Sequence, residues 1–238
     1  MIPAIPFVPS TPFVSLVPLG ALADWGFVLG NADYLVGGLA ITIALTVASI
    51  LLGFAAGFPA GLIEVYGGHY SEAFVASLGV FFRGTPIVVI IIVMFFVVGI
   101  SPAFLAATFA LGLRSAAYQS QIFRGAIESV SGGQMEAARA VGLSRLQAIR
   151  HVIVPQALRR SIPGFQNEFT IVLKDTSIAF AIGLAELLTR SYDLFVQRTT
   201  AVLEIVLFIS LLYFLLTFST NRVLDALRER FVIPGGEG

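Results

Sequence analysis

Residues 134–156 read QMEAARAVGLSRLQAIRHVIVPQ, which is the most polar segment of an otherwise very apolar chain. Residues 136–140 are strong helix formers, and Gly142 suits the left-handed turn that often ends a helix. Pro155 should end or kink a later helix because it lacks a backbone N–H. Two serine–glutamine pairs have the spacing of a capping box, which predicts a helix start at each serine: Ser131 with Gln134, and Ser144 with Gln147. The segment therefore predicts a helix, a sharp glycine turn and a second helix.

This polar segment has two interpretations on composition alone. It carries several arginines and could be an ordinary cytoplasmic loop between two membrane spans, because a basic loop is expected in any membrane protein. It could equally be a docking loop, since the small side chains of Ala137, Ala138 and Ala140 would let another surface approach closely.

The composition is that of an integral membrane protein. The chain has 238 residues, of which 57% are hydrophobic and only 12% charged, and its mean hydropathy is +0.93. A soluble domain would carry roughly 25% charged residues. The net charge of zero gives no basic footprint for nucleic acid. The chain has no cysteine, and its two histidines, His69 and His151, form no ligand cluster, so no metal site is expected.

Five apolar stretches are long enough to cross a bilayer, which takes about 20 helical residues. They cover residues 35–63, 74–100, 103–123, 162–182 and 202–218. We therefore predict an all-α membrane domain over residues 34–230, with about five transmembrane helices. Residues 1–33 are rich in proline and should form an irregular arm, and residues 231–238 form a tail. Residues 183–198 should be an external loop with a short amphipathic helix over 184–189.

A glycine ridge marks the first predicted span. Gly53, Gly57 and Gly61 recur every four residues. Small residues at this spacing let two helices approach closely. We favour packing between two helices of the same subunit over dimerisation.

Polar side chains occur inside the second and third predicted spans. Arg83 should be paired or lie near the membrane surface, because an arginine in hydrocarbon is costly. Arg114 and Tyr118 are four residues apart and so share one helix face. A polar face inside a membrane should point into the bundle or a cavity. This face therefore either lines a pathway or holds buried structural groups.

The fourth predicted span is the least hydrophobic of the five. At 100° per residue, Asn167 lies about 20° from Lys174. Glu168 lies about 20° from Asp175, and roughly 100° round from the first pair. Ionisable groups inside a membrane are functional candidates. We interpret this broad face as part of a translocation pathway, with a buried structural ion network as the alternative.

The distribution of charge predicts how the chain is oriented. Residues 124–160 contain six arginines and only two acidic residues, and three more arginines lie over residues 222–230. Residues 1–33 contain no lysine or arginine. The positive-inside rule makes the polar loop and the C-terminus cytoplasmic. An odd number of spans then puts the N-terminus outside, in a multi-pass protein of the cell membrane.

Catalytic signatures are missing from the sequence. The phosphate-binding GxxxxGK[ST] loop requires a lysine, and the single lysine of the chain, Lys174, lies in a predicted span. Neither GxSxG nor HExxH occurs. The chain is therefore expected not to be an enzyme and to bind no cofactor of its own.

Three motifs resemble those of the permease subunits of ABC importers. The first resembles the EAA loop of that family: Glu136-Ala137-Ala138, then Gly142, then Ile153-Val154-Pro155. Two others are similar to the polar amino acid branch, the histidine/arginine/glutamine-type importers: Arg83-Gly84-Thr85-Pro86, and Leu173-Lys174-Asp175-Thr176-Ser177. The resemblance runs from about Tyr34 to Arg230. One departure is Ser131-Gly132-Gly133, where the family usually has a proline.

The resemblance implies a type I ABC importer permease fold and a set of partners. It makes residues 131–150 a coupling helix region that sits in a groove of the ATP-hydrolysing subunit. The docking residues that it implies are Glu136, Ala137, Ala138, Arg139, Gly142 and Leu143. That separate subunit would bind ATP and Mg. A second permease subunit, identical or a sister chain, would enclose the path, and an extracytoplasmic solute-binding protein would deliver the amino acid.

These observations predict the permease subunit of an ATP-driven importer that moves polar amino acids by alternating access. Glu168 would favour a basic amino acid if it pairs with the substrate side chain. It could equally take the amino group of any amino acid, or pair with Lys174 or Arg114. The alternative is a secondary transporter or channel driven by an ion gradient, with Glu168, Lys174 and Asp175 as a relay. Such folds often show internal repeats, and none is evident here.

Overall fold

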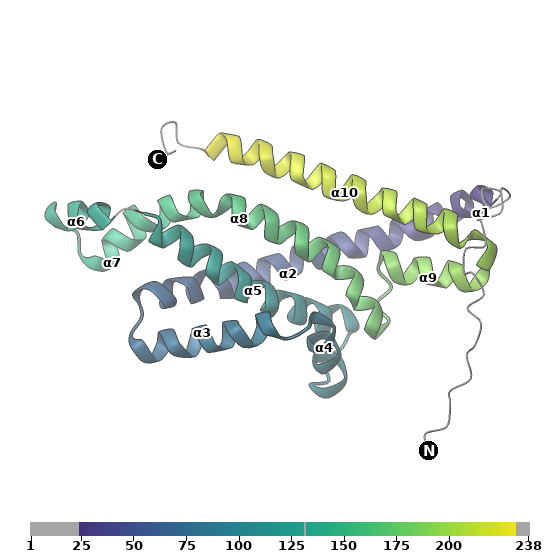
Figure 1. Cartoon of the computed structure of the whole chain (residues 1–238), viewed down its shortest axis with the longest axis horizontal. Coiled ribbons are helices and arrows are strands. Elements are labelled where there is room, and N and C mark those ends of the chain that lie inside the picture. Colours follow the sequence, from purple (N-terminus) through teal and green to yellow (C-terminus); the bar gives the residue numbers. More distant parts are fainter. Residues whose placement is uncertain (1–23, 131, 232–238) are drawn as a thin grey trace, which may run out of the picture.

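The computed structural model describes residues 24–130 and 132–231. Every regular element in these two ranges is helical, so the all-α prediction is confirmed. The helices are α1 (Trp25–Gly30), α2 (Ala32–Tyr66), α3 (His69–Gly84), α4 (Ile87–Ile92), α5 (Ala103–Glu128), α6 (Gly132–Ala140), α7 (Arg145–Ala148), α8 (Val154–Asp175), α9 (Leu187–Gln197) and α10 (Val202–Phe231) (Figure 1). Shorter segments have a π winding, η1 (Val93–Val97) and η2 (Ile149–Ile153), or a tighter 3-10 winding, η3 (Thr176–Ile182) and η4 (Thr199–Ala201).

The long helices run along a common direction and define two ends of the bundle (Figure 1). Helices α1 and α9 lie at one end. Helices α6 and α7 lie at the other, together with the C-terminal end of α10. The loop that carries the polar segment is therefore on the same side as the end of the described chain, as the charge distribution predicts.

The start of the described chain differs from the predicted irregular arm over residues 1–33. Residues 25–30 form α1, and α2 already begins at Ala32. Val28 and Leu35 are buried in an apolar cluster with residues of α9 and α10, which include Leu187 and Ile205. This packing stabilises the helix over residues 25–30. The prolines do not oppose it, because all five prolines of the arm precede residue 24 and lie outside the described residues.

Two helices, over residues 32–66 and 199–226, are long and apolar enough to cross a membrane. The second predicted span, over residues 74–100, is not one continuous helix, because segments 69–84 and 87–97 meet at a bend of 102°. This bent pair is either one broken span or a re-entrant loop. Between them Thr85 is extended (φ −93°, ψ 130°), the conformation that a following proline imposes. Helices α5 and α8, with 26 and 22 residues, have the length to cross but carry polar side chains. The count of five spans stays a prediction.

Helical structure continues without a gap from Arg145 to Ile182, through α7, η2, α8 and η3. The helical winding does not end at Pro155, so of the two expected outcomes, an end or a kink, the first is wrong. Pro155 lies in the first turn of α8, where a missing N–H is tolerated. The wider π winding of η2 comes immediately before it, and such segments relax the usual hydrogen-bond ladder.

Helices α2 and α5 form the largest helix–helix contact of the described chain. A Cβ atom on Gly57 would lie 2.7 Å from the carbonyl oxygen of Ala116, and one on Gly61 would lie 2.9 Å from that of Ser120. A Cβ atom on Gly53 would lie 3.0 Å from Cβ and Oγ of Ser115. The glycine ridge thus packs within the subunit, which confirms the favoured interpretation.

Helix α9 begins at Leu187, later than the helix predicted over residues 184–189. Glu186 explains the shift, because its carboxylate accepts hydrogen bonds from the N–H groups of Leu188 (2.9 Å) and Thr189 (2.7 Å) and so caps the helix. Burial raises the pKa of this carboxyl, although these hydrogen bonds oppose the shift. Tyr213 of α10 also donates to Glu186 at 3.2 Å, which ties α9 to α10.

Candidate docking surface and polar pathway

The turn between α6 and α7 has the geometry that its sequence predicts. Gly142 has a φ of +92°, in the left-handed region. Its N–H donates to the carbonyl of Arg139 (3.0 Å), and the N–H of Leu143 donates to the carbonyl of Ala138 (3.1 Å). These two bonds make a Schellman motif, which satisfies the last carbonyls of α6. The glycine turn is therefore confirmed.

The second capping box is confirmed as well. The N–H of Gln147 donates to Ser144 Oγ (3.3 Å), and the N–H of Ser144 donates to Gln147 Oε1 (2.8 Å). Helix α7 follows Ser144 directly. Ser131, the serine of the first predicted box, lies outside the described residues.

Four of the six residues implied in docking have exposed side chains or backbone on the loop: Glu136, Ala137, Arg139 and Gly142. Leu143 is half-buried. Ala138 is only 5% exposed, so its side chain is packed within the chain and not presented on the loop surface. The small size of Ala138 therefore serves the packing of α6 in this structure.

Two large apolar residues of the loop are exposed, and the sequence analysis did not single them out. Val141 is 80% exposed and Leu146 is 74% exposed. They flank the Gly142 turn in a segment that is otherwise polar. In the sequence, the feature that could have identified them is the presence of two large apolar residues close to Gly142. We take these two exposed apolar side chains as a candidate protein contact.

The loop is anchored to the bundle by apolar packing. Ile153 and Ala157 are buried in a cluster with Ala126, Ile127 and Val130 at the end of α5. Tyr66, at the end of α2, packs against the same cluster, and the guanidinium of Arg145 lies 5.6 Å from the centre of its ring. Arg160 of α8 also donates to Ser129 after α5, at 3.2 Å to Oγ. A displacement of α7 would therefore act directly on α2, α5 and α8.

The predicted polar face of α8 divides into two parts, and Asp175 belongs to the inner one. Arg114 of α5 forms an ion pair with Asp175. The guanidinium also lies 5.3 Å from the centre of the Tyr118 ring, so Arg114 and Tyr118 do share a face. Arg114 is thus taken by Asp175 and forms no ion pair with Glu168 in the described chain.

Glu168 also belongs to the inner part. It is 3% exposed and accepts a hydrogen bond from Ser115 Oγ of α5 at 2.7 Å. Ser115 in turn accepts from Gln119 Nε2 at 3.0 Å. Ser115 could not be singled out from the sequence, because a serine in an apolar helix is as often a packing residue as a polar contact.

Asn167 and Lys174 form the outer part of the α8 face, and both are exposed. Among the described residues, Lys174 takes part in no ion pair. A polar cavity of 320 Å³ lies beside Asn167, between α8 and α10. It is lined by Pro163, Gln166, Asn167, Thr170, Asn221 and Asp225. A membrane helix does not present such a stripe to lipid, so this face belongs against water or another subunit.

Arg83 is paired within the subunit, as expected of an arginine in an apolar helix. Its guanidinium donates to the backbone carbonyl of Ala117 in α5 at 2.6 Å. The residue lies two positions before the break at Thr85, so this bond fixes the end of α3 against α5. Arg83 therefore has a structural partner and does not join the polar face of α8.

Comparison with known proteins gives a family match over most of the chain. The family described as "Binding-protein-dependent transport system inner membrane component" matches residues 49–233. The glutamine transport system permease protein GlnP of Escherichia coli K12 is 33% identical over 220 residues, which cover 88% of this chain and 98% of that protein. The probable amino-acid permease protein YxeN of Bacillus subtilis is 32% identical over 219 residues, 87% of this chain and 95% of that protein.

A solved structure agrees with these relatives. The structure described as an amino acid ABC transporter with histidines has a TM-score of 0.79 and 30% sequence identity. The match covers 87% of this chain and 98% of that one. The arrangement of helices in Figure 1 therefore has a counterpart over nearly the full length of that chain.

Proposed function

Because the chain belongs to the family of binding-protein-dependent transport system inner membrane components, we propose that it is the membrane-spanning permease subunit of an ATP-driven importer of polar amino acids. The observation that carries this proposal is the loop from α6 to α7, which exposes two apolar side chains at one end of the bundle. Relatives named for glutamine and amino-acid transport support the substrate class. A carrier driven by an ion gradient is not favoured by any of these matches.

ATP hydrolysis would come from a separate subunit, which would hold ATP and Mg. The docking surface for it consists of Glu136, Ala137, Arg139, Val141, Gly142 and Leu146. When that subunit changes conformation, the α6–α7 loop would move as a unit, because the Schellman turn and the capping box fix its shape. The ATP-hydrolysing subunit can shift the permease from one conformation to the other only by the difference between its binding free energies for the two conformations.

The remaining partners follow from where polar groups are exposed. Asn167 and Lys174 are exposed on α8, so a second permease subunit would cover them and complete an aqueous path. A solute-binding protein would deliver the amino acid at the opposite end of the bundle, where α1 and α9 lie (Figure 1). The positive-inside rule puts that end outside the cell membrane.

The proposal is tested by uptake into proteoliposomes that contain this chain, the ATP-binding subunit and the solute-binding protein. We expect uptake of an amino acid from a panel of glutamine, glutamate, arginine, lysine and histidine, and only with ATP supplied on the side of the α6–α7 loop. Uptake that survives without ATP and collapses on addition of an uncoupler would instead establish the gradient-driven carrier.

Removing the charge of Glu168 tests whether the transporter prefers basic amino acids. Glu168 is 3% exposed and bonded to Ser115, so it could meet a substrate only in a conformation in which α8 and α5 separate. In that conformation a carboxylate that binds a cationic side chain contributes about 1.5–3 kcal/mol, so Glu168→Gln should lower uptake of arginine, lysine and histidine by roughly 10- to 100-fold. Uptake of glutamine should change little. The matched control is Glu72→Gln, which removes a half-buried carboxylate on α3. An equal loss for every amino acid would mean that Glu168 only holds α8 against α5.

The exposed apolar residues of the loop test the docking surface. Replacing both Val141 and Leu146 by serine removes side chains that are 80% and 74% exposed, so the folded chain should be unaffected. Binding of the ATP-hydrolysing subunit should weaken by roughly tenfold or more, because each buried apolar side chain contributes about 1.5–3 kcal/mol. Co-purification and titration of the subunit measure this. Val196→Ser, which is 68% exposed at the other end of the bundle, is the control.

A further inference from the structure

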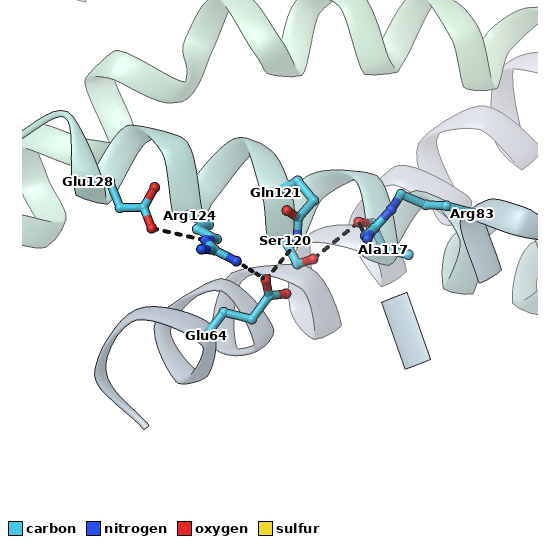
Figure 2. A network of polar contacts seen from close by, with 7 residues as sticks. All are labelled: Glu64, Arg83, Ala117, Ser120, Gln121, Arg124 and Glu128. Carbon is cyan, nitrogen blue, oxygen red and sulfur yellow. Dashed lines mark hydrogen bonds and ion pairs between the residues drawn. The ribbon is translucent and has the colours of Figure 1, made fainter. Parts of the chain in front are cut away.

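A polar network joins the ends of α2 and α5 beside the docking loop (Figure 2). Its centre is Glu64 of α2, whose side chain is fully buried. Gln121 Nε2 of α5 donates to Glu64 Oε2 at 2.6 Å. An Arg124 nitrogen lies 3.6 Å from the same oxygen, and Glu64 Oε1 has no hydrogen-bond partner among the described residues. Glu64 is therefore a buried carboxylate with only part of its bonding capacity used.

Arg124 lies between two carboxylates and is bonded closely to only one of them (Figure 2). Its Nε donates to Glu128 Oε1 at 2.9 Å, one turn further along α5. The 3.6 Å separation from Glu64 is too long for a hydrogen bond. Glu128 is half-exposed, whereas Glu64 is buried. A rotation of the Arg124 side chain would therefore exchange a hydrogen bond to a half-exposed carboxylate for one to a buried carboxylate that is only partly paired.

The position of Glu64 connects this exchange to the docking loop. Tyr66, two residues further along α2, carries Arg145 of α7 over its ring. Leu62 and Val65 pack on the cluster that also holds Ile153 before α8. Within the described residues, Glu64 and Arg124 form the only ion pair between α2 and α5. Movement of the loop would thus change the distance between these two groups.

We propose that Glu64 is a positioning residue for transport, which captures Arg124 from Glu128 when the docking loop moves and so locks the end of α2 to α5 in the second conformation. The inference rests on the proposed function, because it assigns the loop movement to the ATP-hydrolysing partner. A coupling element needs two discrete arrangements, and the Arg124 side chain has two. Arg124 bonded to Glu128 is one, and Arg124 bonded to Glu64 is the other.

The first measurement is the number of amino acid molecules taken up per ATP hydrolysed, in proteoliposomes with the whole complex. Glu64→Gln and Arg124→Gln should each lower this ratio by roughly tenfold, within the range usual for coupling between two sites. Hydrolysis itself should continue, because neither residue lies on the exposed docking surface. The double variant should be no worse than either single one, since both remove the same interaction. Glu72→Gln, which removes a half-buried carboxylate of α3 outside the network, is the control.

The second measurement follows the conformation directly. The sequence has no cysteine, so spin labels can be placed on cysteines introduced at Gly68 and Gly125, where an added Cβ meets no other atom within 4 Å. In complexes diluted with unlabelled permease, the distance between the labels should shift when ATP binds. The shift should be lost in Arg124→Gln. A merely structural role for the network would leave it unchanged.

Arg124→Gln decides the matter if Glu64→Gln fails to fold, because the Arg124 side chain is 39% exposed and its loss should be tolerated. A wild-type ratio and a wild-type distance shift in Arg124→Gln would overturn the proposal. Wild-type protein without ATP-dependent uptake would overturn the proposed function instead. The two failures are therefore distinguishable.

Discussion

Replacing Gly142 by aspartate is expected to abolish ATP-dependent uptake while the permease still folds in the membrane. A residue with a Cβ atom at a φ of +92° loses roughly 1–2 kcal/mol relative to glycine, so the turn should shift to another conformation. The exposed side chains of Val141 and Leu146 flank the turn and would move with it. The added carboxylate also lies on the surface that the ATP-hydrolysing subunit would cover. Uptake into proteoliposomes should fall by roughly 100-fold or more, because the changed turn and the added carboxylate would each weaken binding of the ATP-hydrolysing subunit.

Gly132→Asp is the matched control for this experiment. Gly132 starts α6, has no positive φ, and offers open space to a Cβ atom. An acidic residue in the first turn of a helix is stabilising. The control variant should therefore transport normally, with the permease recovered in full from the membrane. Normal uptake by Gly142→Asp, with the partner subunit present, would show that the turn plays no part in docking.

Replacing Gly57 by leucine is expected to prevent recovery of folded protein. A Cβ atom there would lie 2.7 Å from the carbonyl oxygen of Ala116 and 2.9 Å from Cβ of Gln119. Both belong to the backbone or the base of a side chain and cannot rotate away, so α2 and α5 would have to separate. Overpacking of a tight contact costs about 1–3 kcal/mol and occasionally more. The contact disrupted here, between α2 and α5, is the most extensive helix–helix contact of the described chain.

The yield of monodisperse protein after detergent extraction, and its Tm, measure the effect of the Gly57 substitution. Gly125→Leu is the control, because Gly125 is a glycine of α5 that faces open space. We expect the control variant to keep the yield and Tm of the wild type. A Gly57→Leu protein with unchanged Tm would contradict the close contact between α2 and α5.

The features that could be predicted from the sequence are the ones set by short-range chemistry. The turn at Gly142 and the capping box at Ser144 depend on residues within five positions of each other, so the sequence contains the whole cause. The glycine ridge at Gly57 is also readable, because small residues at this spacing have few uses other than close packing. The existence of the long apolar helices followed from hydropathy, whereas α1, inside the predicted irregular arm, did not.

The features that could not be predicted depend on which neighbour a helix meets. Helical angles placed Glu168 near Asp175 correctly, but they do not say that Ser115 and Arg114 of α5 would take those two carboxylates. The burial of Ala138 arises in the same way. The break at Thr85 was missed for another reason: hydropathy is averaged over a window, and the apolar residues on both sides of the break hide it.

The uninterrupted helical rod from Arg145 to Ile182 has a mechanical consequence. It starts at the docking loop, and its 38 residues would span roughly 57 Å if straight, at about 1.5 Å per residue. The contacts of Glu168 and Asp175 with α5 lie nearer to Ile182 than to Arg145. If these contacts act as the pivot, a tilt of about 3° moves Arg145 by roughly 2 Å and Ile182 by roughly 1 Å in the opposite direction. The two ends of this segment would then move in opposite senses without any change of secondary structure between them.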